Sequence, residues 1–563
     1  MSLAYLVYSY LFLFILIYYY LLHYTHNRSI SSVVLHSFYA AILALFSWLL
    51  LDWAGVVGPR RIKNIPSVPG LPFIGNLYQV NNNPARQYMK WRDTYGDVFQ
   101  MRLGSRIVVV ANSYESVKEL WIKNASANNS RPVLYTFHNI VSKTKGFTVG
   151  TTPWSSDYKV MKKIIATSLN KKNVDNFSDF ISNECTLLLR RIDNEVQTSL
   201  LLTDEEDIDV FKLLQGYVLR VSLYITYGYL VKVEHTDKCK LFDEITHVEN
   251  RIVRLRGHSS NKQDYLPILR FFHFNKKTDA AKDYRRRRDV YMAKFYDGLL
   301  DKIAKDEDFK DAIASRVLRG SPEYPKGVSA DQLNSVCLTM VSAGLDNTPL
   351  MLNHVLGHLS CPINNYGKRL QDIAYCHLMT TYGSMGEAYR QCAFDFECHY
   401  IQALVKEGLR FFSVLPTGLP RATTREIIYK DAVIPSGTIL FMNAFAANHD
   451  TRQFENPYCF FPERYLGEDL RLTSGERPDN FTFGAGTRVC GGLHLSYKEM
   501  YVMLSRFILL YHIEPATDEQ FQMQLDPFEM NSEPGSVAFE PRPFKFVLRY
   551  RDQEMFERLV GSQ

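Results

Sequence analysis

A glycine-rich segment around one cysteine constrains this chain more than any other feature of its 563 residues. The segment reads Phe483-Gly-Ala-Gly-Thr-Arg-Val-Cys-Gly-Gly-Leu-His494. A dinucleotide-binding fingerprint would need a third glycine where Val489 stands. A phosphate-binding loop would need Gly-Lys followed by Ser or Thr, and this segment has neither. The pattern therefore excludes both nucleotide-binding motifs.

The chemistry of the segment depends on what Cys490 does. A zinc site could use Cys490 and His494, although the sequence offers no second ligand pair at a suitable spacing. A cysteine nucleophile with a distant histidine base is a further alternative. Haem-thiolate ligation accounts for more of the residues, because glycines let the backbone pass close under a flat macrocycle and Arg488 can pair with a haem carboxylate. Backbone N–H groups and the start of the next helix would stabilise the thiolate.

The segment resembles the haem-ligand signature of the cytochrome P450 superfamily. The match covers every fixed position of that signature, namely Phe483, Gly484, Gly486, Arg488, Cys490 and Gly492. Three further motifs stand in the expected order, namely Ala343-Gly-Leu-Asp346, Glu407-Gly-Leu-Arg410 and Phe460-Phe-Pro-Glu-Arg-Tyr465. The resemblance covers residues 65–550 and implies the cytochrome P450 fold, one large and mainly α-helical domain with a small β-sheet region.

The resemblance also implies roles for individual residues. Cys490 would be the axial thiolate ligand of the iron in haem b, and Phe483, Gly484 and Gly486 would lie beside the cofactor. The haem edge would be held by Arg488, Arg421, Trp154 and Lys159. Lys159 enters because Tyr158 stands where the superfamily usually has an arginine. A buried structural cluster would consist of Glu407, Arg410 and Arg464.

The oxygen-binding stretch departs from the superfamily pattern at one position. Asn347 stands where a threonine usually helps to deliver protons together with the preceding acid, here Asp346. An amide can still donate a hydrogen bond or hold a water molecule. Thr348 follows, about 100° further round the helix. Pro349 removes the N–H that would pair with the carbonyl of Leu345. Asp346, Asn347 and Thr348 are therefore the candidate catalytic residues.

Longer runs resemble one fungal branch of the superfamily, the phenylacetate hydroxylases. These runs are 129–138, 145–154, 263–270 and 340–349. The resemblance implies ring hydroxylation of phenylacetate or a related aromatic acid, with O2 as the oxygen source. Arg131 and Arg251 are conceivable partners for a substrate carboxylate. The alternatives are a monooxygenase acting on an unrelated secondary metabolite, a reductase-independent haem-thiolate isomerase or dehydratase, and a haem binder without enzymatic activity.

The composition and the motifs of the chain indicate which kinds of partner it binds. A net charge of +6 is too small to indicate nucleic acid as a partner. Nine cysteines are too few for a disulfide scaffold. The chain has no flavin or nicotinamide motif, so electrons are expected from a separate NADPH–cytochrome P450 reductase. The lysines at positions 159, 162 and 163 could offer that reductase a basic surface.

Two apolar stretches near the N-terminus, 3–22 and 33–51, predict a membrane anchor over residues 1–58 with one or two spans. A second stretch that lies along the membrane interface or packs on the globular domain is the alternative to two spans. A signal peptide is the rival interpretation of the first stretch, although the sequence has no obvious basic n-region or cleavage site. Arg60, Arg61 and Lys63 follow the second stretch, so the positive-inside bias places the remaining chain in the cytosol. The expected location is the endoplasmic reticulum membrane. Residues 59–77 are rich in proline and predict an extended tether, and residues 78–563 would form the catalytic domain.

The pattern of the catalytic domain predicts helices with few strands. A hairpin is expected over 97–103 and 106–111, and two strands within 427–442 around the turn 435–437. The expected helices are 113–124, 154–168, 175–197, 207–227, 240–256, 278–305, 330–359, 396–412 and 494–511.

Overall fold

The structure is a computed structural model of the chain. It describes residues 30–53, 58–80, 82–143, 147–203, 206–230, 240–257, 261–271, 276–473 and 480–561. Within these residues the protein is mainly helical with three small sheets, which confirms the expected class. The predicted apolar stretch 3–22 lies outside the described residues.

The helices of the described residues differ widely in length. The longer α-helices are α2 (Ile30–Trp53), α3 (Pro84–Tyr95), α5 (Ser156–Ser168), α7 (Ser178–Thr203), α8 (Phe211–Tyr227), α9 (Lys240–Arg254), α10 (Lys276–Ala304), α12 (Ala330–Leu359), α13 (Tyr366–Tyr382), α15 (His399–Phe412) and α17 (Leu493–Leu510). Shorter ones are α4 (Tyr114–Val117), α6 (Lys171–Asp175), α11 (Ile313–Leu318), α14 (Met385–Gln391), α16 (Ala444–Asn448), α18 (Pro527–Met530) and α19 (Gln553–Phe556). Single turns of 3-10 or π type include η1 (Lys118–Lys123), η2 (Tyr135–Val141) and η8 (Gly486–Arg488).

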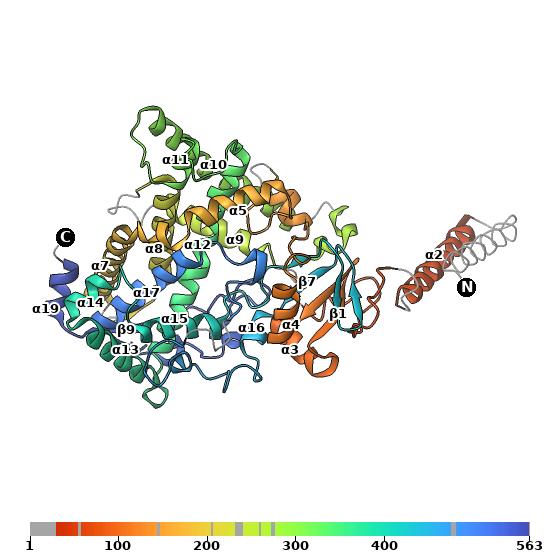
Figure 1. Cartoon of the computed structure of the whole chain (residues 1–563). Coiled ribbons are helices and arrows are strands. Elements are labelled where there is room, and N and C mark those ends of the chain that lie inside the picture. The colour runs from red at the N-terminus through yellow and green to blue at the C-terminus, as the bar shows by residue number, and fades with distance from the viewer. Residues whose placement is uncertain are drawn as a thin grey trace.

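The central element is α12, which has the bounds that its sequence predicts. Ser329 caps its first turn together with Gln332, in a reciprocal capping box. Its second half is buried on nearly every side, since α8, α15 and α17 pack against it. Figure 1 shows α12 in the middle of the helical part, with β1 and β7 on the side nearer to α2.

The four-stranded sheet has the order β1-β2-β7-β4, with strands β1 (Val98–Leu103), β2 (Arg106–Ala111), β7 (Ile439–Met442) and β4 (Arg421–Ala422). The predicted hairpin around Gly104 is present. The prediction for 427–442 was wrong in its count, because three strands occur there: β5 (Ile427–Tyr429) pairs with β6 (Ala432–Ile434), and β7 joins the larger sheet parallel to β2. The additional reversal lies at Lys430, which has a φ of 54°. A third sheet joins β3 (Asp207–Ile208), β9 (Phe546–Tyr550) and β8 (Tyr511–Pro515).

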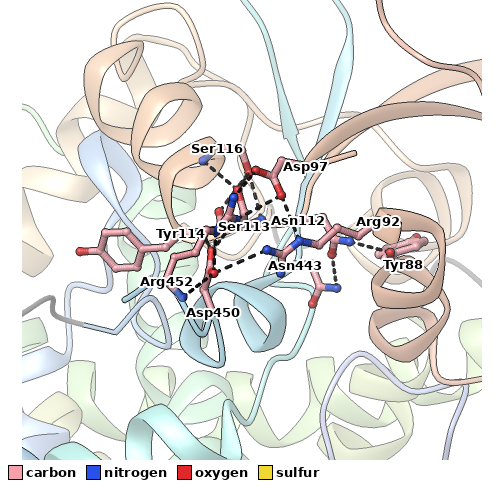
Figure 2. Close-up of polar contacts among 10 residues, drawn as sticks. All are labelled: Tyr88, Arg92, Asp97, Asn112, Ser113, Tyr114, Ser116, Asn443, Asp450 and Arg452. Atoms are coloured by element: carbon pink, nitrogen blue, oxygen red, sulfur yellow. Dashed lines mark hydrogen bonds and ion pairs between the residues drawn. The ribbon is translucent and has the colours of Figure 1, made fainter. Parts of the chain in front are cut away.

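A network of polar side chains ties the sheet end of the molecule to the helical part (Figure 2). Asp97, just before β1, pairs with Arg92 at 3.0 Å and with Arg452 at 2.9 Å. Asp450 accepts from both arginines, at 3.5 and 2.8 Å, and from the backbone N–H of Tyr114 at 3.0 Å. These contacts hold segments that are far apart in the sequence next to one another. They thereby fix the position of the sheet relative to the helical part.

The segment 59–77, expected as a tether, packs partly on β1. The side chain of Gln100 bonds the backbone of Ile62 and Ile65, and Val68 donates to the Gln100 carbonyl at 2.9 Å. Asp52, at the end of α2, accepts from Arg102 at 2.6 Å and from the N–H of Phe73 at 2.7 Å. None of the helices in the described ranges meets the requirements of length and apolar character for crossing a membrane.

Candidate functional site

One large cavity lies between α5, α12 and the glycine-rich segment before α17. It has about 1610 Å³ of space free of protein atoms, part of it continuous with solvent. Its lining is mostly apolar, and its polar groups include Cys490, Arg131, Arg421, Arg488, Asn347 and Thr348.

The segment before α17 places Cys490 at the cavity wall. Its N–H donates to the carbonyl of Phe483 at 2.9 Å, which closes the loop. Gly486 has a φ of 61°, and a Cβ there would collide with the carbonyl of Trp121. Helix α17 begins three residues after Cys490, at Leu493. Phe483 and Gly484 line the cavity, whereas Gly486 serves the backbone turn beneath it.

The Cys490 side chain is exposed because it borders the cavity. Its removal from bulk water raises the pKa of the thiol, while the N–H of Gly492 and the ammonium of Lys162 lower it. Lys162 reaches the site from α5, where its Nζ donates to the carbonyl of Val489 at 2.8 Å. Metal coordination deprotonates a thiol outright, so the positive surroundings favour the thiolate form of a metal-bound sulfur.

Three arginines meet at one edge of the cavity without a carboxylate partner among the described residues. Arg131 donates to the carbonyls of Gly150, Leu419 and Pro420, and Arg421 donates to those of Asn128 and Ala485. Arg488 donates only through Nε, to Asn129 at 2.7 Å, and both of its terminal nitrogens are buried without a partner.

The charges of this arginine cluster, Arg131, Arg421 and Arg488, are uncompensated. Burial lowers the pKa of Arg421 to about 9 and that of Arg488 to about 10, and the charge of Arg488 adds to the shift of Arg421. Burial, followed by the other two guanidinium groups, holds the pKa of Arg131 well below its usual value. A ligand with two carboxylates would relieve this repulsion and satisfy the free Arg488 nitrogens. The residues present therefore fit a haem, with its two propionates at the arginine cluster and its iron at Cys490.

Two of the predicted haem-edge residues do not line the cavity. The Trp154 side chain is 36% exposed, and Lys159 is exposed and stacks over the Trp154 ring at 5.3 Å. Tyr158 and Lys162 face the cavity instead, and Tyr158 lies 3.5 Å beneath the guanidinium of Arg488. These two residues are four positions apart and therefore share one face of α5, and this spacing could have predicted from the sequence that they face the cavity together. The prediction of Lys159 depends on its spacing from Trp154, which precedes the first turn of α5.

The two arginines considered for a substrate carboxylate have different surroundings. Arg131 belongs to the arginine cluster, as described above. Arg251 is exposed on α9 and is not part of the cavity lining. The described residues contain no group of three or more His, Cys, Asp or Glu side chains that could hold a metal ion. The zinc alternative therefore finds no ligand set there.

The candidate catalytic residues of α12 point in different directions. Asn347 lines the cavity and donates its amide to the carbonyl of Ala343, one turn earlier, at 3.0 Å. Thr348 also lines the cavity, and its hydroxyl donates to Ser496 on α17 at 3.0 Å. Asp346 is buried behind them and is not part of the lining.

Asp346 lies in a polar environment built by α8 and α9. It accepts from Gln215 at 3.2 Å, and the side-chain amide of Asn250 lies beside it and donates to its oxygens in the flipped amide orientation, which satisfies both groups. Burial raises the pKa of Asp346 to about 7, with Glu540 and Glu249 adding to the rise. The group can thus exchange a proton near neutral pH, although other side chains separate it from the cavity.

The predicted structural cluster comes together as expected. Glu407 and Arg410, three residues apart on α15, form a bidentate pair at 2.8 and 2.7 Å and are both fully buried. Arg464 joins Glu407 at 3.1 Å, and the two arginines donate to the carbonyls of Pro457 and Glu455. The cluster therefore pins the segment before the cysteine loop onto α15.

Comparison with known proteins gives the family. A family model described as Cytochrome P450 matches residues 66–539. Phenylacetate 2-hydroxylase of Emericella nidulans is 37% identical over 502 residues, which is 89% of this chain and 93% of that protein. A 3-hydroxyphenylacetate 6-hydroxylase of the same organism is 34% identical, over 86% and 88% of the two chains. Cytochrome P450 monooxygenase CYP3 of Mycosarcoma maydis is 31% identical, over 90% of each chain. The chain therefore belongs to the cytochrome P450 family of haem-thiolate, reductase-dependent monooxygenases.

Proposed function

We propose that this chain inserts one oxygen atom from O2 into the ring of a small aromatic acid, phenylacetate or a hydroxyphenylacetate. The observation that carries the proposal is the pair of relatives at 37% and 34% identity, since the name of each states hydroxylation of a phenylacetate. Both alignments cover more than four fifths of this chain. The mostly apolar lining of the cavity supports an aromatic substrate.

Each residue at the cavity then has a role. Cys490 would hold the iron of a bound haem, and the arginine cluster would hold its propionates. Bound haem supplies the activation of O2, while the protein supplies orientation, burial and protons. Asn347 donates a hydrogen bond to the Ala343 carbonyl and orders water beside it. Asp346, on the side of α12 that faces away from the cavity, can hold a proton near neutral pH. The apolar wall, which includes Val149, Met340 and Leu419, positions the ring and excludes water.

Electrons come from NADPH through a separate reductase that docks beside the cysteine loop. Lys159 and Lys163 are exposed on α5, and Lys162 joins this helix to the loop through Val489. This basic surface lies over the thiolate side of the site and suits an acidic partner. Residues 1–58 anchor the chain in the endoplasmic reticulum membrane, with the catalytic domain in the cytosol. The apolar stretches and the basic residues 60, 61 and 63 support that topology.

Incubation with a reductase and a panel of aromatic acids tests the reaction. We expect a ring-hydroxylated product that requires both NADPH and the reductase. The reduced, carbon-monoxide-bound protein should show the red-shifted Soret band of thiolate ligation, and Cys490→Ser should abolish it. Cys376→Ser, which alters an exposed cysteine on α13, is the matched control and should leave the band unchanged.

Each of the other outcomes would support a different function or a different iron ligand. Turnover of unrelated metabolites without any aromatic acid product would contradict the substrate class. A product formed without reductase would favour an isomerase or a dehydratase. A Soret band that persists in Cys490→Ser would show that another residue binds the iron.

A further inference from the structure

A lysine of α5 carries its charge beside the cysteine loop. Lys162 lines the cavity, and its Nζ donates to the carbonyl of Val489 at 2.8 Å. Val489 directly precedes Cys490, the residue that would bind the iron of a haem. The ammonium group of Lys162 is therefore held against the stretch of backbone that carries the thiolate.

The close approach of α5 to this loop depends on a glycine. A Cβ at Gly491 would lie 2.5 Å from Cγ2 of Ile165 and 4.0 Å from Nζ of Lys162. Ile165 is buried and lies three residues after Lys162, on the same helix. A side chain at position 491 would therefore push the loop away from α5, whereas glycine lets the backbone come close. The loop thus lies within reach of the lysine.

The charge of Lys162 is not balanced by a carboxylate. No acidic side chain of the described ranges forms an ion pair with it, whereas the buried Lys498 of α17 pairs with Asp175 at 2.7 Å. Burial raises the pKa of the Cys490 thiol, but the N–H of the loop and the Lys162 ammonium lower it, so the ammonium and the sulfur interact. Lys162 is half-buried, so solvent screens this interaction only in part.

A positive charge beside an iron–thiolate group changes how readily the iron takes up an electron. Reduction of ferric iron adds one negative charge, which a nearby cation stabilises. The same cation weakens electron donation by the sulfur, because charge and hydrogen bonds around a ligand set its donor strength. We propose that Lys162 raises the reduction potential of the thiolate-bound haem iron and thereby favours acceptance of the electron that the reductase delivers. The proposal rests on haem-thiolate ligation and not on the substrate class.

Spectroelectrochemical titration of the haem-loaded full chain tests the proposal without reductase or substrate, so that docking plays no part. We expect Lys162→Met to shift the ferric–ferrous equilibrium toward ferric iron by about tenfold, which lowers the midpoint potential by about 59 mV. Lys162→Arg keeps the charge and should retain the wild-type potential. Lys163→Met is the matched control, because Lys163 is exposed and points about 100° further round α5.

Infrared spectroscopy of the carbon-monoxide-bound protein gives an independent measurement. Without the cation the sulfur donates more strongly, so the C–O stretching frequency should fall in Lys162→Met and stay unchanged in Lys162→Arg and Lys163→Met. The red-shifted Soret band should persist in all three variants, since Cys490 still binds the iron.

Two outcomes would overturn the proposal. One is a wild-type potential in Lys162→Met, and the other is an equal fall in Lys163→Met, which would assign the effect to the general surface charge. If Lys162→Met loses the red-shifted band, Lys162→Gln replaces it, because its amide keeps a donor for the Val489 carbonyl without the charge. A lowered potential in Lys162→Gln supports the role of the charge. A wild-type potential there would contradict it and assign the contact to loop packing alone.

Discussion

At the scale of single residues, Asn347 shows how a departure from a family pattern can keep part of its function. Its amide donates to the Ala343 carbonyl one turn earlier, a bond that a threonine hydroxyl at the same position could also make. The bond keeps a polar group of α12 satisfied at the cavity wall. The substitution therefore retains the hydrogen bond and loses only the ability to exchange a proton.

The first prediction concerns this amide. Asn347→Ala removes the side-chain donor at the Ala343 carbonyl, which keeps only its backbone partner in the helix, so the cavity wall loses a polar group and product per NADPH should fall while peroxide rises. Loss of one preorganised donor costs up to about 10²-fold. Asn347→Thr should retain coupling, because its hydroxyl can restore the bond. Product, peroxide and NADPH are measured in one assay. An equal ratio of product to consumed NADPH in Asn347→Ala and the wild type would show that the side chain only fills space.

At the scale of elements, the packing of residues 455–464 against α15 depends on the buried cluster of Glu407, Arg410 and Arg464. Removing one partner of a fully buried ion pair leaves an uncompensated charge, which typically costs 3–5 kcal/mol. We expect Glu407→Gln to lower the free energy of unfolding by about that amount, since it leaves Arg410 and Arg464 without their shared carboxylate.

A matched control lies on α14. Glu387 pairs with Arg390 at the same spacing of three residues, at 2.6 Å, but both side chains are exposed. Glu387→Gln should lower the free energy of unfolding far less than Glu407→Gln does, because solvent screens exposed ion pairs on helices. Urea unfolding followed by circular dichroism compares the two variants. Similar losses for both would mean that the buried cluster does not secure the segment.

Another element-scale prediction concerns two histidines of α12. His354 and His358 are fully buried, and burial lowers the pKa of each to about 3. The unfolded chain binds protons at these sites below about pH 6.5, whereas the folded protein does not. Their contribution to the free energy of unfolding is therefore complete above pH 6.5. It is lost as the pH falls from 6.5 toward 3, because only the unfolded chain takes up protons in that range.

Unfolding measurements between pH 7 and pH 4 check this sign. Each buried histidine should add about 1.4 kcal/mol per pH unit to the loss of stability. His354→Phe, which retains an aromatic ring against Phe412, should make the dependence shallower. His247→Gln changes an exposed histidine on α9 and should leave the dependence unchanged. A stability that does not vary with pH would contradict the assignment of neutral, buried rings.

The sequence predicted elements whose signals are local. The bounds of α12 follow from its capping box and its apolar residues, and the Cys490 loop follows from glycines and an arginine within a few positions. What depends on tertiary contact was missed. The place of Arg131 beside Arg421 joins segments almost 300 residues apart, and β8 pairs with β9 across a long loop. Helix α13 also escaped prediction, since its apolar face is interrupted by polar residues.

At the scale of the whole molecule, side-chain contacts join α2 to the catalytic domain in addition to the polypeptide backbone. Asp52 is buried, with a side-chain exposure of 1%, and pairs with Arg102 of β1. The Trp48 ring packs on Phe73 with centroids 5.8 Å apart. These contacts fix the end of α2 against the four-stranded sheet, so the orientation of the domain relative to this helix is set by specific side chains.

The last prediction concerns topology. Two apolar stretches followed by basic residues should hold the chain in the endoplasmic reticulum membrane with residues beyond 72 on the cytosolic side. In sealed microsomes the protein should therefore resist extraction by carbonate, and added protease should digest the catalytic domain. A lumenal marker protein that stays intact until detergent is added controls for sealing. Because a cytosolic reductase must reach the basic face of α5, protection of the domain in sealed vesicles would contradict both the topology and the docking surface.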